Sequence, residues 1–294
     1  MRLPDVIGIG PAHAGTTWLH WVLKARVGLP LPEKETHFFD HHYNRGIEWY
    51  AERFAHCATA AVVAEICPYF QSPRACERIA RHIPDCRIIC QLRDPVDRAY
   101  SAYKFALYNE LTNDDFERAI ETTPRIMDGN TYARDLRNWL NAFGRDRVLI
   151  LLFDDLRRSP QAYIDRVCEF IEVPKIDLAE LELPARAINA HYLKPRYPSL
   201  ARKGRRAMNW LEDRNLDRAV SWLGRLGIWK LCFAGEFPRI RPETELRLRE
   251  RYRAEIEELE DLIDCDLSRW KHVANVAAAE TPPAEAPPGM MSSH

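Results

Sequence analysis

The chain has 294 residues, of which 46% are hydrophobic and 29% are charged, and its formal net charge is −1. This length suffices for one large α/β domain or two small ones, and the composition is that of an ordinary globular protein. The near-neutral charge argues against a general nucleic-acid-binding protein, and no apolar run is long enough to span a membrane.

The first predicted elements are a strand, a glycine-rich turn and a helix. "DVIGIG" (5–10) is a short apolar run that ends at glycine, and "TTWLHWVLKAR" (16–26) has its apolar residues at helical spacing. This order is the first half of a βαβ unit. A second strand is expected at 60–66, followed by a helix over 72–83 with Ser72 as N-cap and Pro73 at its first position.

The same alternation continues through the middle of the chain. Strands are expected at 86–93 and 147–156, and helices at 95–109, 131–144 and 159–173. Strands that alternate with helices predict a single α/β domain of P-loop-like type, in which a mostly parallel sheet is flanked by helices on both faces.

The C-terminal part differs in composition. Lys and Arg far outnumber Asp and Glu over 186–225, which is typical either of a solvated helical face or of a basic lid over an anion. A charged amphipathic helix is expected at 242–263, and the Ala/Pro-rich residues 274–294 are expected to be a disordered tail. The expected organisation is one domain over 1–273 with a basic helical insertion or lid at about 186–240.

The turn between Gly10 and Thr17 has the form of a phosphate-binding loop without its lysine. Gly10 and Gly15 have the spacing of G-x-x-x-x-G-K-[ST], but Thr16 occupies the lysine position. Backbone N–H groups at a helix N-terminus bind anions, whereas a nucleoside triphosphate also needs that Lys and a Mg²⁺. The loop therefore favours a ligand with less charge here, such as a phosphate that carries a sulfuryl group.

The segment "HAGTT" resembles the 5′-phosphosulfate loop of sulfotransferases that use 3′-phosphoadenosine 5′-phosphosulfate (PAPS). Gly15, Thr16 and Thr17 match the Lys/Arg-x-Gly-Thr-Thr pattern of that family, but His13 stands where the family has Lys or Arg. The resemblance implies that the backbone N–H groups from Ala14 to Thr17, with both threonine hydroxyls, bind the 5′-phosphate.

Two later segments are similar to the 3′-phosphate sites of the same family. "RDPVDRAYS" matches Arg-x-Pro-x-x-Arg-x-x-Ser, and the resemblance implies that Arg93 and Ser101 bind the 3′-phosphate. A late Lys-Gly loop of the family corresponds to Lys203 and Gly204 in "SLARKGRR". Arg196 or Tyr197 are the alternatives for this second role.

The acceptor side is indicated by "PEKETHFFD" (32–40), which resembles the Lys-Glu-x-x-Phe-Phe segment of heparan-type and related bacterial sulfotransferases. The resemblance implies that Lys34 lies near the transferred group and that Glu35 takes the proton of the acceptor. His37 is a second candidate base, because an imidazole titrates near neutral pH. Alternatively, Glu35 only pairs with Lys34 or another cation. Ile66 and Cys67 replace a polar pair of many relatives, so a substrate contact is not carried over there.

The resemblance implies a PAPS-dependent sulfotransferase that moves a sulfuryl group to a hydroxyl or amine of an acceptor, such as a carbohydrate or a small metabolite, and releases 3′,5′-ADP. In-line transfer would rest on positioning and charge stabilisation and would need no metal. We expect His13 and Lys34 to share the positive charge that stabilises the leaving phosphate. One alternative is a P-loop nucleoside-triphosphate-dependent kinase, with Asp154 and Asp155 as the nearest Mg²⁺ ligands. The other is a non-catalytic nucleotide-binding scaffold.

Cysteine usage and the N-terminus indicate the compartment. The eight cysteines include no Cys-x-x-Cys pair, which argues against a zinc site and favours reduced, buried thiols. The start of the sequence has no apolar leader or anchor, so a cytoplasmic protein without a membrane span is expected.

Overall fold

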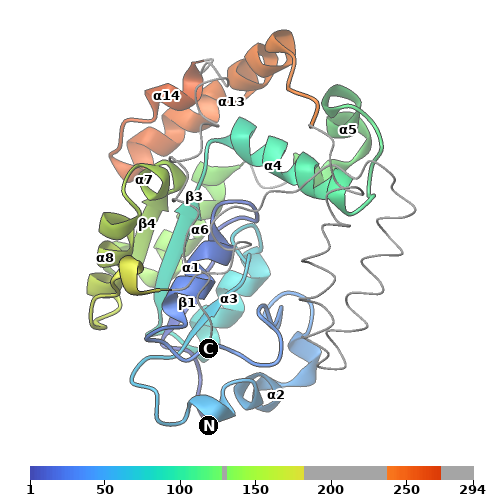
Figure 1. Cartoon of the computed structure of the whole chain (residues 1–294). Helices are drawn as coiled ribbons and strands as arrows, with labels where there is room; N and C mark the ends of the chain where they lie inside the picture. The colour runs from blue at the N-terminus through green and yellow to red at the C-terminus, as the bar shows by residue number, and fades with distance from the viewer. Residues whose placement is uncertain (128–130, 182–236, 273–294) are drawn as a thin grey trace, which may run out of the picture.

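The sheet of this protein is entirely parallel, as the computed structural model shows for residues 1–127, 131–181 and 237–272 (Figure 1). β1 pairs with both β2 and β3, and β3 pairs with β4, so the strand order is β2-β1-β3-β4. Val6 lies opposite Ala64 on one side and Arg87 on the other. The strands are β1 (Val6–Gly8), β2 (Ala64–Ile66), β3 (Arg87–Leu92) and β4 (Val148–Leu152).

Local signals set where the helices begin. The Ser72 hydroxyl caps α3 by accepting a hydrogen bond from the Ala75 N–H at 3.1 Å, and a proline occupies the start of α3, α4, α8 and α13. The helices are α1 (Thr16–Leu23), α2 (Ile47–Glu52), α3 (Pro73–His82), α4 (Pro95–Tyr108), α5 (Phe116–Thr122), α6 (Tyr132–Phe143), α7 (Phe153–Arg158), α8 (Pro160–Phe170), α13 (Pro242–Ile263) and α14 (Ser268–Lys271).

Strand β4 is shorter than the sequence predicts. The expected strand at 147–156 ends at Leu152, and residues 153–158 form the short helix α7. Asp154 and Asp155 lie in the first turn of α7 and two arginines lie in its last turn, which is the charge order that a helix dipole favours. The apolar segment is therefore a strand only as far as Leu152, and its remaining residues begin a helix.

Strand residues alternate between two apolar layers, one on each face of the sheet. Ile7 and Ile88 pack into a cluster that includes residues of α3, α4, α6 and α13. Val6 and Ile89, their sequence neighbours, pack into a second cluster with residues of α1 and α8. Because side chains alternate along a strand, both faces of the sheet are covered by helices, which confirms the predicted fold class.

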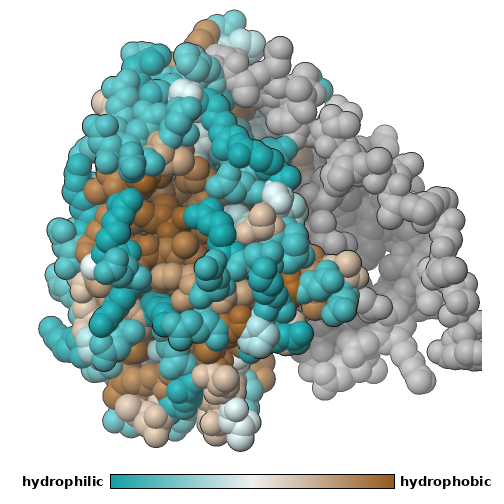
Figure 2. Space-filling view, turned by 90° about the vertical axis from the view of Figure 1, so that its left-hand side faces the viewer, coloured by the Kyte–Doolittle hydropathy of each residue, from teal (hydrophilic) through white to brown (hydrophobic). Residues whose placement is uncertain are grey.

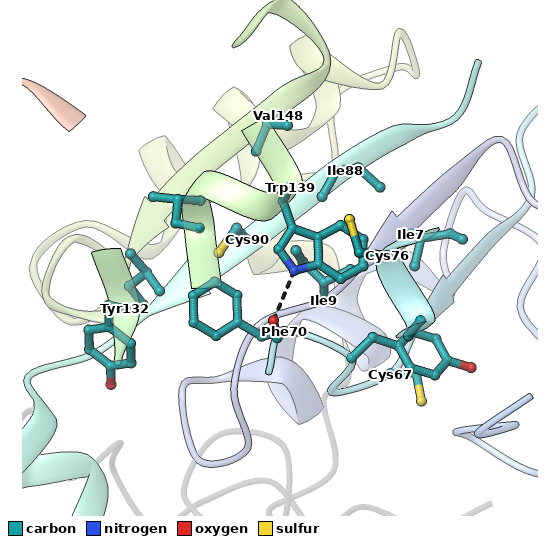
Figure 3. Close-up of a cluster of buried hydrophobic side chains, with 14 of the residues drawn as sticks. Ile7, Ile9, Cys67, Phe70, Cys76, Ile88, Cys90, Tyr132, Trp139 and Val148 are labelled. Atoms are coloured by element: carbon teal, nitrogen blue, oxygen red, sulfur yellow. Dashed lines mark hydrogen bonds between the residues drawn. The ribbon is translucent and has the colours of Figure 1, made fainter. Parts of the chain in front are cut away.

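Trp139 of α6 lies at the centre of the larger cluster (Figure 3). Its Nε1 donates a hydrogen bond to the Phe70 carbonyl oxygen at 2.9 Å, so the buried indole is satisfied. The seven cysteines among the described residues are free, and six of them are buried. Burial raises the pKa of Cys76 and of Cys86 to about 12, as is usual for thiols that act as small hydrophobes.

No helix in the three described ranges is both long and apolar enough to cross a bilayer. On the side of the molecule that carries α7 and α8, apolar residues gather near the centre and polar residues surround them (Figure 2).

The basic insertion expected at 186–240 lies largely outside the described residues, as do Lys203, Gly204 and the tail at 274–294.

Candidate active site

The glycine loop links β1 to α1 at the carboxyl end of the sheet. Gly10 lies so close to β3 that a Cβ there would be 2.8 Å from the Gln91 carbonyl oxygen. Gly15 has a φ of 96°, and a Cβ there would be 3.0 Å from Cδ2 of Phe153. Close backbone approach and left-handed geometry therefore require glycine at both positions.

The backbone of this loop suits an anion. His13 has a φ of 72° and lies two residues before Gly15, which is also left-handed. Alternating backbone of this kind turns successive N–H groups toward one side. Among the described residues, no acceptor is found for the backbone N–H groups of residues 14–17. These donors, together with the N-terminus of α1, fit a phosphate group.

Arg93 reaches the loop from the end of β3. Its Nη1 donates to the His13 carbonyl oxygen at 3.2 Å, and its guanidinium carbon lies 4.5 Å from the centre of the Phe153 ring. Its Nε is buried and has no hydrogen-bond partner within the described part of the chain. A buried, unsatisfied donor on a cation is well suited to an anionic ligand. Ser101 is half-buried on α4, the helix that follows Arg93.

The environment of His13 keeps its imidazole neutral. The side chain is half-buried and its ring centre lies 5.4 Å from that of Phe105. Burial, followed by the charges of Arg98 and Arg93, lowers the pKa of His13 to about 3. The positive charge next to the loop therefore comes from Arg93, Arg98 and Lys34 and not from His13.

The segment that carries the candidate base lies directly against the glycine loop. Lys34 Nζ is 3.2 Å from the Thr17 hydroxyl oxygen and 2.7 Å from Glu35 Oε1. One lysine thus bridges the hydroxyl of Thr17 and the carboxylate of Glu35. The structure thereby joins the glycine loop to the 32–40 segment, two motifs that are separate in the sequence.

Glu35 belongs to a chain of charged groups. Its Oε2 lies 3.5 Å from His37 Nε2, and His37 Nδ1 lies 3.1 Å from Asp40 Oδ2. Burial raises the pKa of Glu35, but hydrogen bonds from His37 and Lys34 outweigh it and lower the pKa to about 2. Hydrogen bonds to Asp40 and Glu35 raise the pKa of His37 to about 10. Glu35 is therefore an ionised acceptor, and His37 is a protonated donor.

The same turn brings His37, Asp40 and His41 together, with one ligand-type atom of each within 4.8 Å of the others. Both ring nitrogens of His37 face a carboxylate oxygen, and the His41 side chain is 71% exposed. Ion pairs account for these contacts, and we assign no metal ion to the cluster.

Some residues next to the site carry no sequence signal. His20 lies on the apolar face of α1, where its Nδ1 is buried without a described partner. Burial, followed by the charge of Lys34, lowers its pKa to about 4. Phe153, which contacts Arg93, occupies the first position of α7. Both look like ordinary core residues in the sequence, because their role depends on neighbours far along the chain.

Comparison with known proteins gives one consistent family. The sulfotransferase domain profile matches residues 3–185. The bifunctional heparan sulfate N-deacetylase/N-sulfotransferase 3 of Homo sapiens is 31% identical over 196 residues, which cover 58% of this chain and 22% of that protein. The heparan sulfate glucosamine 3-O-sulfotransferase 3B1 of Homo sapiens is 29% identical over 185 residues, covering 60% of this chain and 47% of that one. The chain thus spans less than half the length of these curated relatives.

A solved structure agrees at the level of the fold. The sulfotransferase from Alicyclobacillus acidocaldarius superposes with a TM-score of 0.65 at 21% identity, covering 92% of this chain and all of that one. The profile match includes the glycine loop, the 34–37 segment and Arg93, the same residues that the structure brings together. The chain therefore belongs to the sulfotransferase domain family.

Proposed function

We propose that this chain transfers a sulfuryl group from PAPS to a hydroxyl or amine of an acceptor, with release of 3′,5′-ADP. One observation carries the proposal. A phosphate-type loop without a lysine at position 16 is joined by the Lys34–Thr17 contact to an ionised carboxylate at Glu35. These contacts support the proposal, because acid–base-assisted group transfer requires an anion site directly beside a proton acceptor.

The donor side would be held by groups from two strand ends. The backbone N–H groups of residues 14–17 and the Thr16 and Thr17 hydroxyls would hold the 5′-phosphate. Arg93 would hold the 3′-phosphate, with Ser101 as a second ligand and a basic residue such as Lys203 as a third. PAPS, when bound, supplies the activated sulfuryl group. The buried Nε of Arg93 supports this fit, because it would gain an acceptor.

The acceptor side would use Glu35 as the base. Glu35 is ionised and can accept a proton, whereas His37 is already protonated and can only donate. His37 would therefore hold Glu35 in place, and Lys34 would stabilise negative charge between the donor and the acceptor. His13 would donate a hydrogen bond to the 5′-phosphate group.

We further propose that the acceptor is a carbohydrate, because the curated relatives named above are heparan sulfate sulfotransferases. We also propose a cytoplasmic location, which the free thiols support.

The two acids of the kinase alternative have structural partners instead. Asp154 accepts a hydrogen bond from Trp270 Nε1 at 2.7 Å and lies 3.6 Å from Arg269. Asp155 lies 3.6 Å from Arg158. These contacts explain both acids without a Mg²⁺ ion, so the structure favours sulfuryl transfer over triphosphate chemistry.

Incubation of the full chain with radiolabelled PAPS and a panel of acceptors tests the proposal. The panel contains an N-deacetylated heparosan polysaccharide, its N-acetylated form and a set of small amines and alcohols. We expect acceptor-dependent release of 3′,5′-ADP and labelled product, and a loss of both in Glu35→Gln. Tight binding of 3′,5′-ADP without transfer to any acceptor would indicate the non-catalytic scaffold instead.

A further inference from the structure

A fully buried glutamate lies beneath the segment that carries the candidate base. We propose that Glu65 is a positioning residue, which fixes the loop of Lys34, Glu35 and His37 against the glycine loop through Thr36. This inference rests on the proposed function for its catalytic consequence. Glu65 lies in β2 and its exposed fraction is 0%, so it cannot contact the acceptor substrate itself.

The contacts of Glu65 converge on one residue of that loop. Its Oε1 accepts hydrogen bonds from the Thr36 N–H at 2.9 Å and from the Thr36 hydroxyl at 2.6 Å. Its Oε2 accepts a hydrogen bond from the Tyr50 hydroxyl at 2.7 Å, and the Tyr69 hydroxyl approaches the same oxygen at 3.3 Å. Both the backbone and the side chain of Thr36 are therefore held by the same carboxyl group.

Thr36 lies between the functional residues of the loop, so its position determines theirs. Residues 33–37 form neither helix nor strand, so side-chain contacts must fix their path. The Thr36 hydroxyl oxygen also accepts a hydrogen bond from the Phe38 N–H at 3.2 Å. His37 has a left-handed φ of 48°, a conformation that the surrounding contacts must maintain. A shift of Thr36 would move Glu35 and His37 together.

The choice of a carboxyl group at this position has a chemical reason. Four donors face it, namely one N–H and three hydroxyl groups. An ionised carboxylate has only acceptor sites, about four of them, whereas a glutamine would turn an NH₂ group toward some of these donors. The hydrogen-bond partners of Glu65 among the described residues are neutral groups, and burial raises its pKa. A buried carboxyl group without a cation costs free energy, so a purely structural position in β2 would favour an apolar residue.

The test compares Glu65→Gln with Asp135→Asn in the full chain. Asp135 is 2% exposed, lies on α6 away from the loop, and accepts a hydrogen bond from the Thr131 hydroxyl at 2.9 Å. Both variants remove one buried carboxylate without a change of shape. We expect Glu65→Gln to lower kcat by about 10²-fold, as for a misplacement of about 1 Å. The Kd of 3′,5′-ADP should stay within about twofold, because the donor ligands lie outside this network. Asp135→Asn should change neither.

A second readout needs no acceptor. The protonation of His37, which faces Glu35, Asp40 and His41, can be followed by nitrogen NMR of its imidazole ring. In the wild type the pKa should lie near 10, and in Glu65→Gln it should fall toward 6.5, because the contacts that hold the proton depend on the path of the loop. Thr36→Val removes only the hydroxyl donor, so it should lower kcat and the His37 pKa in the same direction but by less. This variant replaces Glu65→Gln in the test if Glu65→Gln does not fold.

The outcomes separate the inference from the proposed function. A wild-type kcat and an unshifted His37 titration in Glu65→Gln and Thr36→Val would overturn the positioning role. Equal losses of kcat and of 3′,5′-ADP affinity would also overturn it, since they indicate a general structural defect. If the wild type transfers no sulfate while the His37 pKa still falls in Glu65→Gln, the proposed function fails and the positioning role stands.

Discussion

His13 stands at the position where the resembling loops carry Lys or Arg, yet its surroundings keep it neutral. Its pKa is lowered to about 3 by burial and by Arg98 and Arg93. We therefore assign the permanent charge at the loop to the arginines and to Lys34, and expect His13 to act as a hydrogen-bond donor until phosphate groups approach and favour its protonated form.

Replacement of His13 tests this role. His13→Gly removes the imidazole together with its hydrogen-bond donor and adopts the left-handed φ of 72° without strain. We expect turnover at saturating PAPS to fall by about 10²–10³, the loss that follows removal of one stabilising donor. His42→Gly is the matched control, since the His42 ring packs against Trp49 at 5.9 Å, away from the loop. Near-normal turnover of His13→Gly would remove His13 from the mechanism.

His37 should make stability depend on pH. Hydrogen bonds to Asp40 and Glu35 raise its pKa from 6.5 to about 10, so its stabilising contribution is complete below pH 6.5 and is lost as the pH rises through about 10. At the acid end, the contribution of Glu35 is complete above pH 4.5 and is lost as the pH falls toward about 2. The charged cluster thus contributes fully between pH 4.5 and 6.5.

Urea unfolding of His37→Gln checks this window. The variant should be less stable than the wild type by on the order of 1 kcal/mol near pH 6, given its partial exposure, and the difference should disappear near pH 10. His41→Gln should show little difference at either pH, because that side chain is 71% exposed. A constant difference across the range would mean that His37 stabilises the protein through packing alone.

At the scale of elements, the site depends on a buried link between α13 and the start of α4. Arg249 of α13 lies 2.9 Å from Asp94 Oδ2 and 2.8 Å from Glu245 Oε1, and it is 2% exposed. Asp94 in turn accepts hydrogen bonds from the Val96 and Asp97 N–H groups at the first turn of α4. Helix α13 therefore supports the turn that begins directly after Arg93.

Removal of this arginine should destabilise the whole domain. Arg249→Met keeps most of the aliphatic stem but leaves two buried carboxyl groups without their cation, so we expect a loss of about 3–5 kcal/mol in the free energy of unfolding. Arg253→Met, one turn further along the same helix, removes only an exposed pair with Glu250 and should cost less than about 0.5 kcal/mol. Chemical unfolding of both variants measures the difference, and equal costs would contradict the proposed link.

At the scale of the whole molecule, the anion site exists only when separate parts of the chain are folded together. Arg93 donates to the carbonyl oxygen of a residue 80 positions earlier, and Lys34 reaches back 17 positions to Thr17. The proposed phosphate site therefore belongs to the native state and is absent from the unfolded chain. A ligand that binds there must stabilise the fold.

Ligand-linked stability distinguishes the alternatives for the nucleotide. At a concentration of about 100 times its Kd, 3′,5′-ADP should raise the free energy of unfolding by about 2.7 kcal/mol. Arg93→Met should abolish most of this gain, and ATP with Mg²⁺ at the same concentration should give less. Stronger stabilisation by ATP with Mg²⁺ would favour the kinase alternative.

Features that depend on a few neighbouring residues could be predicted from the sequence. The alternation of apolar strands and amphipathic helices indicated a parallel α/β domain, and the strand order confirms it. Gly10 and Gly15 indicated the tight turn between β1 and α1, because close approach at Gly10 and a positive φ at Gly15 demand glycine. Ser72 and the leading prolines marked helix starts, which depend on one or two residues.

Features that depend on burial or on distant neighbours were decided by the tertiary structure alone. The sequence by itself shows that histidine stands at position 13, where related loops have Lys or Arg. Only the tertiary structure buries this histidine beside Arg98 and Arg93, and burial followed by these charges lowers its pKa. The sequence placed Glu65 in an apolar strand, and only the fold directs it to Thr36. Local patterns encode backbone propensity and hydrophobic periodicity, whereas pKa values and hydrogen-bond networks arise from atoms that are adjacent in space and remote along the chain.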